Sequence, residues 1–245
     1  MSKCTSASSG VDAVLFDLGN TLVHYYTRAE FGPILRRSVR RIVERLQDAR
    51  WPEALDEDAL ERRAHALNHE NADGRVRPLE ERLVELLGAR AVPDALLAEL
   101  TERFLEPIFA TARLDPDALP TLAKLKTAGV KTAIVSNTPW GSSARRWRAE
   151  LARLGLLEHI DAAVFCMDVG WRKPAPAVFE RALEVLGVTP ARACFVGDDP
   201  EWDVAGARRA GLVPVLLGDP SDAPPACQTI AKLADVIEIV ERVRR

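Results

Sequence analysis

Reactive side chains recur at four places where a short apolar run of the sequence ends. Asp17 follows the run Val14-Leu15-Phe16, and the triplet Ser136-Asn137-Thr138 follows an apolar run at residues 131–135. The third and fourth places carry Lys173 and the acid pair Asp198-Asp199. A carboxylate, a hydroxyl, an ammonium group and a second acid cluster are together the inventory of a magnesium-dependent phosphoryl-transfer site.

Each of these groups has a chemical task in such a site. Asp17 and Asp198 offer the hard oxygen ligands that Mg²⁺ prefers. A carboxylate can attack phosphorus only if the negative charges of both partners are offset, which the metal and Lys173 would do. The Ser136 hydroxyl would hold a phosphoryl oxygen. The residue types therefore predict Asp17 as nucleophile, with Ser136 and Lys173 as catalytic partners.

Further residues are expected to support or line this site. Thr21 would orient the turn after Asp17, and Asp203 would order Lys173 or the waters of the metal. We expect substrate contacts from three residues: Asn137, Gly19 and His24.

Most of these residues also have a purely structural interpretation. Ser136 could cap the next segment, and Lys173, which precedes a proline, could be a solvated loop lysine. Asp199 and Asp203 could be a helix N-cap and a first-turn acid favoured by the helix dipole. His24 could line the pocket beside Asp17 or serve as a structural residue at a domain junction.

The elements that must position these groups alternate along the second half of the chain. Besides the first strand, which ends before the Gly19-Asn20 turn, strands are expected at Lys131–Val135, Ala162–Cys166, Ala193–Val196 and Val213–Leu217. Helices punctuated by Pro and Gly separate them, and a last amphipathic helix is expected over Ile230–Val243. This alternation predicts an α/β fold with a Rossmann-like, doubly wound parallel sheet whose strand ends share one edge.

Residues 25–113 have a different character, rich in Arg and Glu. Apolar residues recur at helical spacing in this region and no strand is convincing, so we expect an all-helical insertion of about four helices. The predicted domains are a disordered lead at residues 1–10, a catalytic core at 11–24 and 114–245, and a helical cap at 25–113.

Composition narrows the class of protein. The 245 residues carry 33 Lys and Arg against 36 Asp and Glu, a formal charge of -3, which argues against nucleic-acid and membrane-surface partners. No apolar run has the length of a membrane span, and the polar lead does not resemble a signal peptide. The four cysteines lack metal-site spacing and are typical of reduced thiols. We therefore expect a cytoplasmic protein.

At its reactive residues the chain resembles the haloacid dehalogenase-like hydrolase superfamily. Four motifs carry the resemblance in order: Phe16-Asp-Leu-Gly-Asn-Thr-Leu22, Val135-Ser-Asn-Thr138, Arg172-Lys-Pro174 and Val196-Gly-Asp-Asp-Pro-Glu-Trp-Asp203. The resemblance implies that Asp17 forms an aspartyl-phosphate and that Mg²⁺ is held by Asp17, the carbonyl of Gly19 and Asp198. It also implies that the helical cap closes over the core and selects the substrate.

Gly19 departs from the family pattern. Phosphatases of this superfamily commonly carry there a second aspartate, which protonates the leaving oxygen and then deprotonates water. Loss of a general acid or base typically costs about 10² to 10⁴ in rate, most severely for alkoxide leaving groups. Our hypothesis is that His24, a cap residue or the substrate itself supplies the missing proton transfer.

Three functions remain open from the sequence. The first is a magnesium-dependent phosphatase of a small phosphorylated metabolite, which needs the acids of the fourth motif. The second is a metal-independent 2-haloacid dehalogenase, whose subgroup usually has an aromatic residue in the place of Gly19. The third is a protein of little turnover that binds a phosphorylated ligand or a partner for regulation.

The sequence does not identify the substrate. One or two cap arginines could clamp a second anionic group: Arg28, Arg36, Arg37, Arg40 and Arg41. On a helix most such charges form the solvated face. Oligomeric state is equally open, and either a monomer or a homodimer fits.

Overall fold

A computed structural model describes residues 10–67, 73–89, 91–225 and 227–244. Except for Gly10, the expected disordered lead lies outside these residues, and so do the side chains of Arg28, Val243 and Arg244. Among the described helices, none combines the length and the apolar character needed to cross a membrane.

A six-stranded sheet, in which all neighbouring strands are parallel, forms the centre of the described chain. Its strand order is β5-β4-β1-β6-β7-β8. The strands are β1 (Ala13–Phe16), β4 (Lys131–Ser136), β5 (Ala162–Phe165), β6 (Ala193–Gly197), β7 (Val213–Leu217) and β8 (Gln228–Ile230). Strand β1 therefore lies between β4 and β6, which are distant from it in the sequence.

Both faces of the sheet are covered because strand side chains alternate. Ala13 and Leu15 of β1 face the helices α8 (Pro176–Leu186) and α9 (Gly206–Arg209). Val14 and Phe16 face the opposite layer. That layer consists of α5 (Ala118–Thr127), α6 (Ala144–Arg153) and α10 (Val236–Arg244). The predicted α/β, doubly wound class is confirmed.

Local signals set the ends of these helices. Pro176 occupies the first turn of α8, where its missing N–H has no intrahelical partner, and Gly187 ends the helix in a left-handed conformation. The side chain of Ser143 caps α6 by accepting a hydrogen bond from the Arg146 amide at 3.4 Å. The short helix α7 (Cys166–Val169) follows β5 directly.

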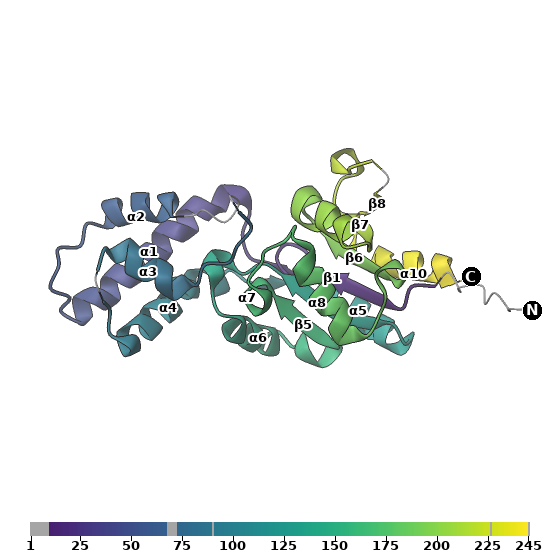
Figure 1. The fold of residues 1–245 in the computed structure, drawn as a ribbon, viewed down its shortest axis with the longest axis horizontal. Coiled ribbons are helices and arrows are strands. Elements are labelled where there is room, and N and C mark those ends of the chain that lie inside the picture. Colours follow the sequence, from purple (N-terminus) through teal and green to yellow (C-terminus); the bar gives the residue numbers. More distant parts are fainter. Residues whose placement is uncertain (1–9, 68–72, 90, 226, 245) are drawn as a thin grey trace, which may run out of the picture.

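Four helices leave the sheet between two short strands. Strands β2 (Val23–His24) and β3 (Arg113–Leu114) pair antiparallel, and between them lie α1 (Phe31–Asp48), α2 (Glu57–Ala66), α3 (Leu79–Leu87) and α4 (Asp94–Phe109). Figure 1 shows these helices gathered on one side, with the sheet and its helices on the other. We call α1–α4 the helical insert.

Two short features differ from the sequence-based expectation. The chain at Gln228–Ile230 is an edge strand, and the last helix begins only at Val236, so the expected helical start at Ile230 was wrong. The ribbon of β2 and β3 was not expected, because two-residue strands carry no readable alternation.

Candidate active site

The ends of three neighbouring strands bring Asp17, Ser136 and Asp198 to one edge of the sheet. Phe16 of β1 is in register with Ile134 of β4 and Val196 of β6. The amide of Asp17 continues the ladder by donating to the Val196 carbonyl at 2.9 Å. The sheet register, rather than loop conformation, therefore fixes the position of Asp17.

Lys173 is held between two carboxylates. Its Nζ lies 2.6 Å from Asp17 Oδ1 and 2.6 Å from Asp203 Oδ1, and the residue is only 3% exposed. Its backbone is fixed by Asn137, whose Oδ1 accepts from the Lys173 amide at 2.8 Å and whose Nδ2 donates to the Lys173 carbonyl at 3.3 Å. Lys173 is thus a buried, positioned cation and not a solvated loop lysine.

Asp203 lies in a π-helical segment, Pro200–Ala205, which begins within the fourth motif. Asp199 is the N-cap of this segment, accepting from the Glu201 and Trp202 amides at 2.8 Å each. Asp203 Oδ2 accepts from the Asp199 amide at 3.1 Å. Asp199 is therefore a helix N-cap, as the structural interpretation of the sequence expected. Asp203 instead lines the pocket and holds Lys173.

Gly197 leaves the space that Asp203 needs. A Cβ atom built on Gly197 would lie 2.2 Å from Asp203 Oδ2, far inside contact distance. The glycine of the fourth motif therefore permits close approach of a carboxylate to the end of β6.

Burial and charge crowding perturb the acids of the site. Burial, followed by the charge of Asp17, raises the pKa of Asp198 to about 7. Burial likewise raises the pKa of Asp203, against the opposing effect of Lys173. Burial alone would lower the pKa of Lys173, but Asp17 and Asp203 outweigh it and raise that pKa. The lysine is firmly protonated, and one positive charge faces three carboxylates.

The donor set at the strand ends fits a hard divalent cation. Oxygen atoms of Asp17, Asp198 and Asp203 lie within 4.8 Å of one another. Both oxygens of Asp203 already have partners, in Lys173 and the Asp199 amide. Asp17 and Asp198 are left as carboxylate ligands, a number typical of Mg²⁺ sites completed by water and phosphate oxygens.

A pocket of about 570 Å³ opens over this cluster. It is lined by the expected residues Asp17, Gly19, Ser136, Asn137, Lys173, Asp198, Asp199 and Asp203. Ser136 is 5% exposed, and its hydroxyl donates to the Asn137 carbonyl at 3.2 Å. Asn137 lines the pocket, but its amide is engaged with the Lys173 backbone, so positioning the lysine is its visible contact.

Two expected residues do not reach the pocket. His24 was expected to contact substrate, but its side chain is 43% exposed and its Nε2 lies 3.0 Å from Asp115 Oδ2. His24 does not line the pocket, whereas its neighbour Tyr25 does. Thr21 is fully buried and does not line the pocket, and its hydroxyl has no partner among the described residues.

The sequence analysis did not predict the aromatic and apolar lining of the pocket. Aromatic and apolar side chains from the insert, its connections and the core line it: Tyr25, Tyr26, Phe31, Ile108, Trp140, Trp147 and Trp202. The aromatic pair Tyr25-Tyr26, eight residues after the nucleophile, was the available signal, but spacing alone does not show which ring faces a ligand.

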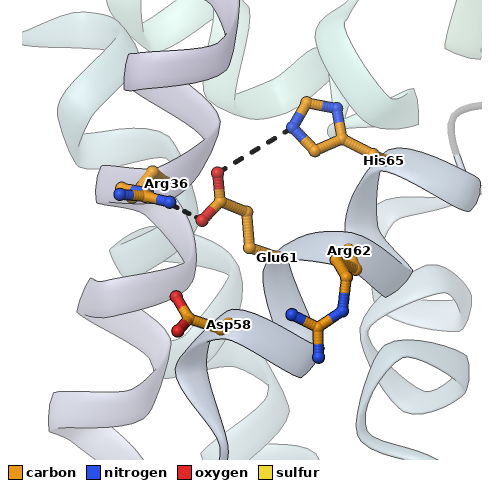
Figure 2. A pocket seen from close by; sticks show the side chains of 5 residues that line it. All are labelled: Arg36, Asp58, Glu61, Arg62 and His65. Carbon is orange, nitrogen blue, oxygen red and sulfur yellow. Dashed lines mark hydrogen bonds and ion pairs between the residues drawn. The ribbon is translucent and has the colours of Figure 1, made fainter.

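A second depression, of about 330 Å³, lies on α1 and α2 (Figure 2). Its side chains are Arg36, Asp58, Glu61, Arg62 and His65, and none comes from a strand end. Arg36 Nε lies 2.7 Å from Glu61 Oε2, and His65 Nε2 lies 4.0 Å from Glu61 Oε1. Arg36 is thus engaged with Glu61, and none of these residues lies at a strand end, so we assign the chemistry to the pocket over Asp17.

Comparison with known proteins identifies a family and several relatives of this chain. The family model of the haloacid dehalogenase-like hydrolases matches residues 11–211. A glyceraldehyde 3-phosphate phosphatase of Methanopyrus kandleri is 32% identical over 207 residues, 84% of each chain. A ribulose-1,5-bisphosphate 5-phosphatase of Halopiger xanaduensis is 31% identical, covering 91% of this chain and 90% of the relative.

The fold is also similar to solved structures. A 2-haloacid dehalogenase from Pseudomonas syringae superposes with a TM-score of 0.68 at 24% identity, over 95% of this chain and 99% of the other. This likeness concerns the fold alone.

Proposed function

The chain belongs to the haloacid dehalogenase-like hydrolases, and we propose that it is a magnesium-dependent phosphatase that hydrolyses a small phosphorylated metabolite through an aspartyl-phosphate. The observation that carries the proposal is the contact of Lys173 with both Asp17 and Asp203, beside Asp198. The names of the two phosphatase relatives support the reaction class.

In the proposed reaction an oxygen of Asp17 attacks phosphorus, and the bond from phosphorus to the leaving oxygen breaks. The leaving oxygen takes the electron pair and a proton. Water then attacks the aspartyl-phosphate, which releases inorganic phosphate and regenerates the carboxylate. Lys173 stabilises the charge on Asp17 and the phosphoryl group, and the Ser136 hydroxyl turns from the Asn137 carbonyl to a phosphoryl oxygen.

Magnesium, when bound by Asp17, Asp198 and the Gly19 carbonyl, would offset the negative charge of the reacting groups. Asp203 keeps Lys173 in place, and Asp199 holds the segment that carries Asp203. The fit of the donor set supports this assignment.

Because residue 19 is a glycine, no aspartate at this position can protonate the leaving oxygen or deprotonate the attacking water. His24 does not line the pocket and contacts Asp115, which favours a cap residue, the solvent or the substrate for that part. We therefore expect slow turnover of substrates whose leaving group is a poorly acidic alcohol.

We propose that the helical insert acts as the cap over the core site. Phe31 of α1 and Ile108 of α4 line the pocket together with the strand-end acids, which supports a role in substrate choice. A cytoplasmic location is part of the proposal and is supported by the buried free thiols Cys166 and Cys194.

The experiment is hydrolysis of an activated aryl phosphate by wild type and Asp17→Asn, with magnesium and with chelator. We expect magnesium-dependent turnover that the substitution reduces by at least about 10³-fold, because the nucleophile is lost. Unchanged turnover in Asp17→Asn would contradict the proposal. Haloacid turnover that chelator does not affect would instead establish a dehalogenase. No turnover, with a rise of the melting temperature on adding phosphate, would favour a binding protein.

A further inference from the structure

We infer that the preferred substrate is an aryl phosphate monoester, with one phosphate on an aromatic ring and no second anionic group. This inference rests on the proposed phosphatase function and adds the chemical class of the leaving group. Three independent features of the described residues carry it: the aromatic lining, the engagement of the nearby cations and the glycine beside the nucleophile.

The pocket lining is rich in aromatic residues. Six rings line it: Tyr25, Tyr26, Phe31, Trp140, Trp147 and Trp202. They support one another, because Tyr25 and Phe109 both pack edge-on against Trp147, with ring centroids 5.4 Å and 4.9 Å apart. A planar aromatic group gains stacking and edge-to-face contacts in such surroundings beyond the burial of its area. At about 570 Å³ the pocket has room for a ring as well as a phosphate.

The pocket offers little to a second anion. Among the residues that line it in the described part of the chain, the cations are Arg172 and Lys173. Lys173 is shared by Asp17 and Asp203, and Arg172, 4% exposed, donates to the Thr138 carbonyl at 3.0 Å. A carboxylate or second phosphate would therefore lie near acids without a positive partner.

Three of the insert arginines that sequence reasoning offered as anion clamps are engaged elsewhere. Arg36 and Arg40 pair with the α2 acids Glu61 and Glu57, with nitrogen-oxygen distances of 2.7 Å and 3.1 Å. Arg41 pairs with Glu106 at 2.6 Å. None of these three lines the pocket, and the exposed Arg37 does not line it either.

Gly19 favours an acidic leaving group. A phenol ionises with a pKa of about 10, as tyrosine does, so its oxygen can depart without a proton donor. An alcohol, with a pKa close to the 15.7 of water, needs that donor. The nearest atom to a Cβ built on Gly19 is Tyr25 Cδ2, at 4.0 Å. Beside Gly19 this chain presents the edge of an aromatic ring.

Two hydrogen-bond donors are buried within the wall and do not reach the pocket surface. The Tyr25 hydroxyl and the Trp140 Nε1 have no hydrogen-bond partner among the described residues, and these residues are 7% and 2% exposed. Trp140 also has a left-handed backbone, with φ of 56°, a strained conformation for a residue with a side chain. These two residues therefore offer a ligand no accessible side-chain donor, which suits an apolar ring.

Binding tests the inference without turnover. We would titrate the magnesium-loaded protein with phenylphosphonate, methylphosphonate and phosphonoacetate in a calorimeter. We expect the dissociation constant of phenylphosphonate to be at least about tenfold lower than that of methylphosphonate, and phosphonoacetate to bind no more tightly than methylphosphonate. Tighter binding of phosphonoacetate, or equal binding of the phenyl and methyl compounds, would overturn the inference.

Kinetics separates this inference from the proposed function. We expect kcat/KM for phenyl phosphate to exceed that for glycerol 3-phosphate and ribulose 1,5-bisphosphate by at least about 10²-fold. A preference for the bisphosphate that Asp17→Asn abolishes would refute the aryl class and leave the phosphatase intact. Turnover that persists in Asp17→Asn would refute the phosphatase, whatever the phosphonate ranking.

Substitutions of Phe31 locate the specificity in the pocket. Phe31 is half-buried at the start of α1. Phe31→Leu should lower the ratio of kcat/KM for phenyl phosphate to that for glycerol 3-phosphate several-fold. Phe31→Arg should raise the relative kcat/KM for ribulose 1,5-bisphosphate about tenfold by supplying a cation. The matched control is Trp51→Leu, an insert aromatic that does not line the pocket. If Trp51→Leu changed these ratios as much as the Phe31 variants, the inference would fail.

Discussion

At the scale of single residues, the site is organised by the sharing of one buried lysine. A buried cation with two carboxylate partners is stable only while its partners remain, and breaking a buried pair typically costs about 3–5 kcal/mol. Asp17 is thus both the proposed nucleophile and half of the counter-charge of Lys173. Positioning by Asn137 and Asp203 leaves the lysine little freedom to follow a displaced partner.

Gly197→Ala tests how closely the carboxylates must approach. Its Cβ would lie 2.2 Å from Asp203 Oδ2, so either Asp203 or the end of β6 must move. We expect a loss of about 1–3 kcal/mol in the free energy of unfolding, measured with urea, and a loss of turnover because Lys173 moves with Asp203.

The control for this substitution is Gly32→Ala in α1. Apart from its chain neighbours and the backbone of its own helix, no described atom lies within 4 Å of its Cβ position, so we expect its free energy of unfolding to change by less than about 1 kcal/mol. Equal behaviour of the two variants would show that Asp203 does not need the space beside Gly197.

The residue types in the sequence pointed to the charged and polar residues that line the pocket. They did not show which aromatic rings or hydroxyl groups would line it. Asp17, Ser136 and Asp198 lie together because parallel strands place their ends at one edge, which the alternation of elements reveals. Lys173 joins them from the loop after α7, where Asn137 holds its backbone. His24 does not line the pocket, and the two-residue strand β2 gives no pattern from which its side could have been predicted. Whether Tyr25 or His24 points inward depends on the pairing of β2 with β3, a contact distant in the sequence.

At the scale of elements, the π-helical segment Pro200–Ala205 presents Asp203 to the site. Two backbone amides at its start are satisfied by Asp199, and the amide of Asp199 is bound by Asp203 in return. Asp199 and Asp203 therefore hold each other in place, and loss of either side chain should disturb the position of the other.

Asp199→Ala should cost about 0.5–2 kcal/mol in the free energy of unfolding, because two amides lose their acceptor. Turnover should fall as well, since Asp203 loses its fixed backbone. The matched control is Asp219→Ala, which removes a similar cap from the Ser221 amide at a distance from the pocket. We expect a smaller stability loss there and unchanged turnover. Unchanged turnover in Asp199→Ala would show that Asp199 caps the segment but does not affect the site.

Sequence patterns predicted the longer elements and missed the short ones for a physical reason. Strands β6 and β7 are apolar runs between turn signals, and β4 has an apolar centre at residues 133–135; such runs are visible in one chain. The edge strand β8 has three residues, with only Ile230 buried, so its apolar signal merged with that of the helix that follows. Its existence depends on pairing with β7, which local sequence does not encode.

At the scale of the whole molecule, the insert and one face of the sheet share a hydrophobic core. Buried residues form a continuous cluster from Phe16 and Ile134 of the sheet to Ile42 and Leu83 of the insert. Phe104 of α4 packs against Trp140 with ring centroids 5.0 Å apart. The Arg77 carbonyl lies only 1.9 Å from where a Gly141 side chain would begin, so the two parts are in close contact.

This continuity predicts that the chain unfolds in a single calorimetric transition, with the insert and the sheet melting together. Phe104→Ala should lower the midpoint, at a cost of about 3–5 kcal/mol, and leave one transition. Scanning calorimetry with equal calorimetric and van't Hoff enthalpies checks this expectation. Two resolved transitions, with only the earlier one moved by Phe104→Ala, would show that the insert is an independent folding unit.

The central place of β1 has a consequence for synthesis of the chain. From Phe16, at the end of β1, to Lys131, at the start of its neighbour β4, 115 residues must be made. At the usual pace of about 5–20 residues per second, this takes on the order of ten seconds. During that interval the apolar strand next to Asp17 has neither neighbour, while the insert helices can already form from local contacts. A nascent chain therefore exposes its most buried strand first, and β1 is the segment that a ribosome-associated chaperone would meet.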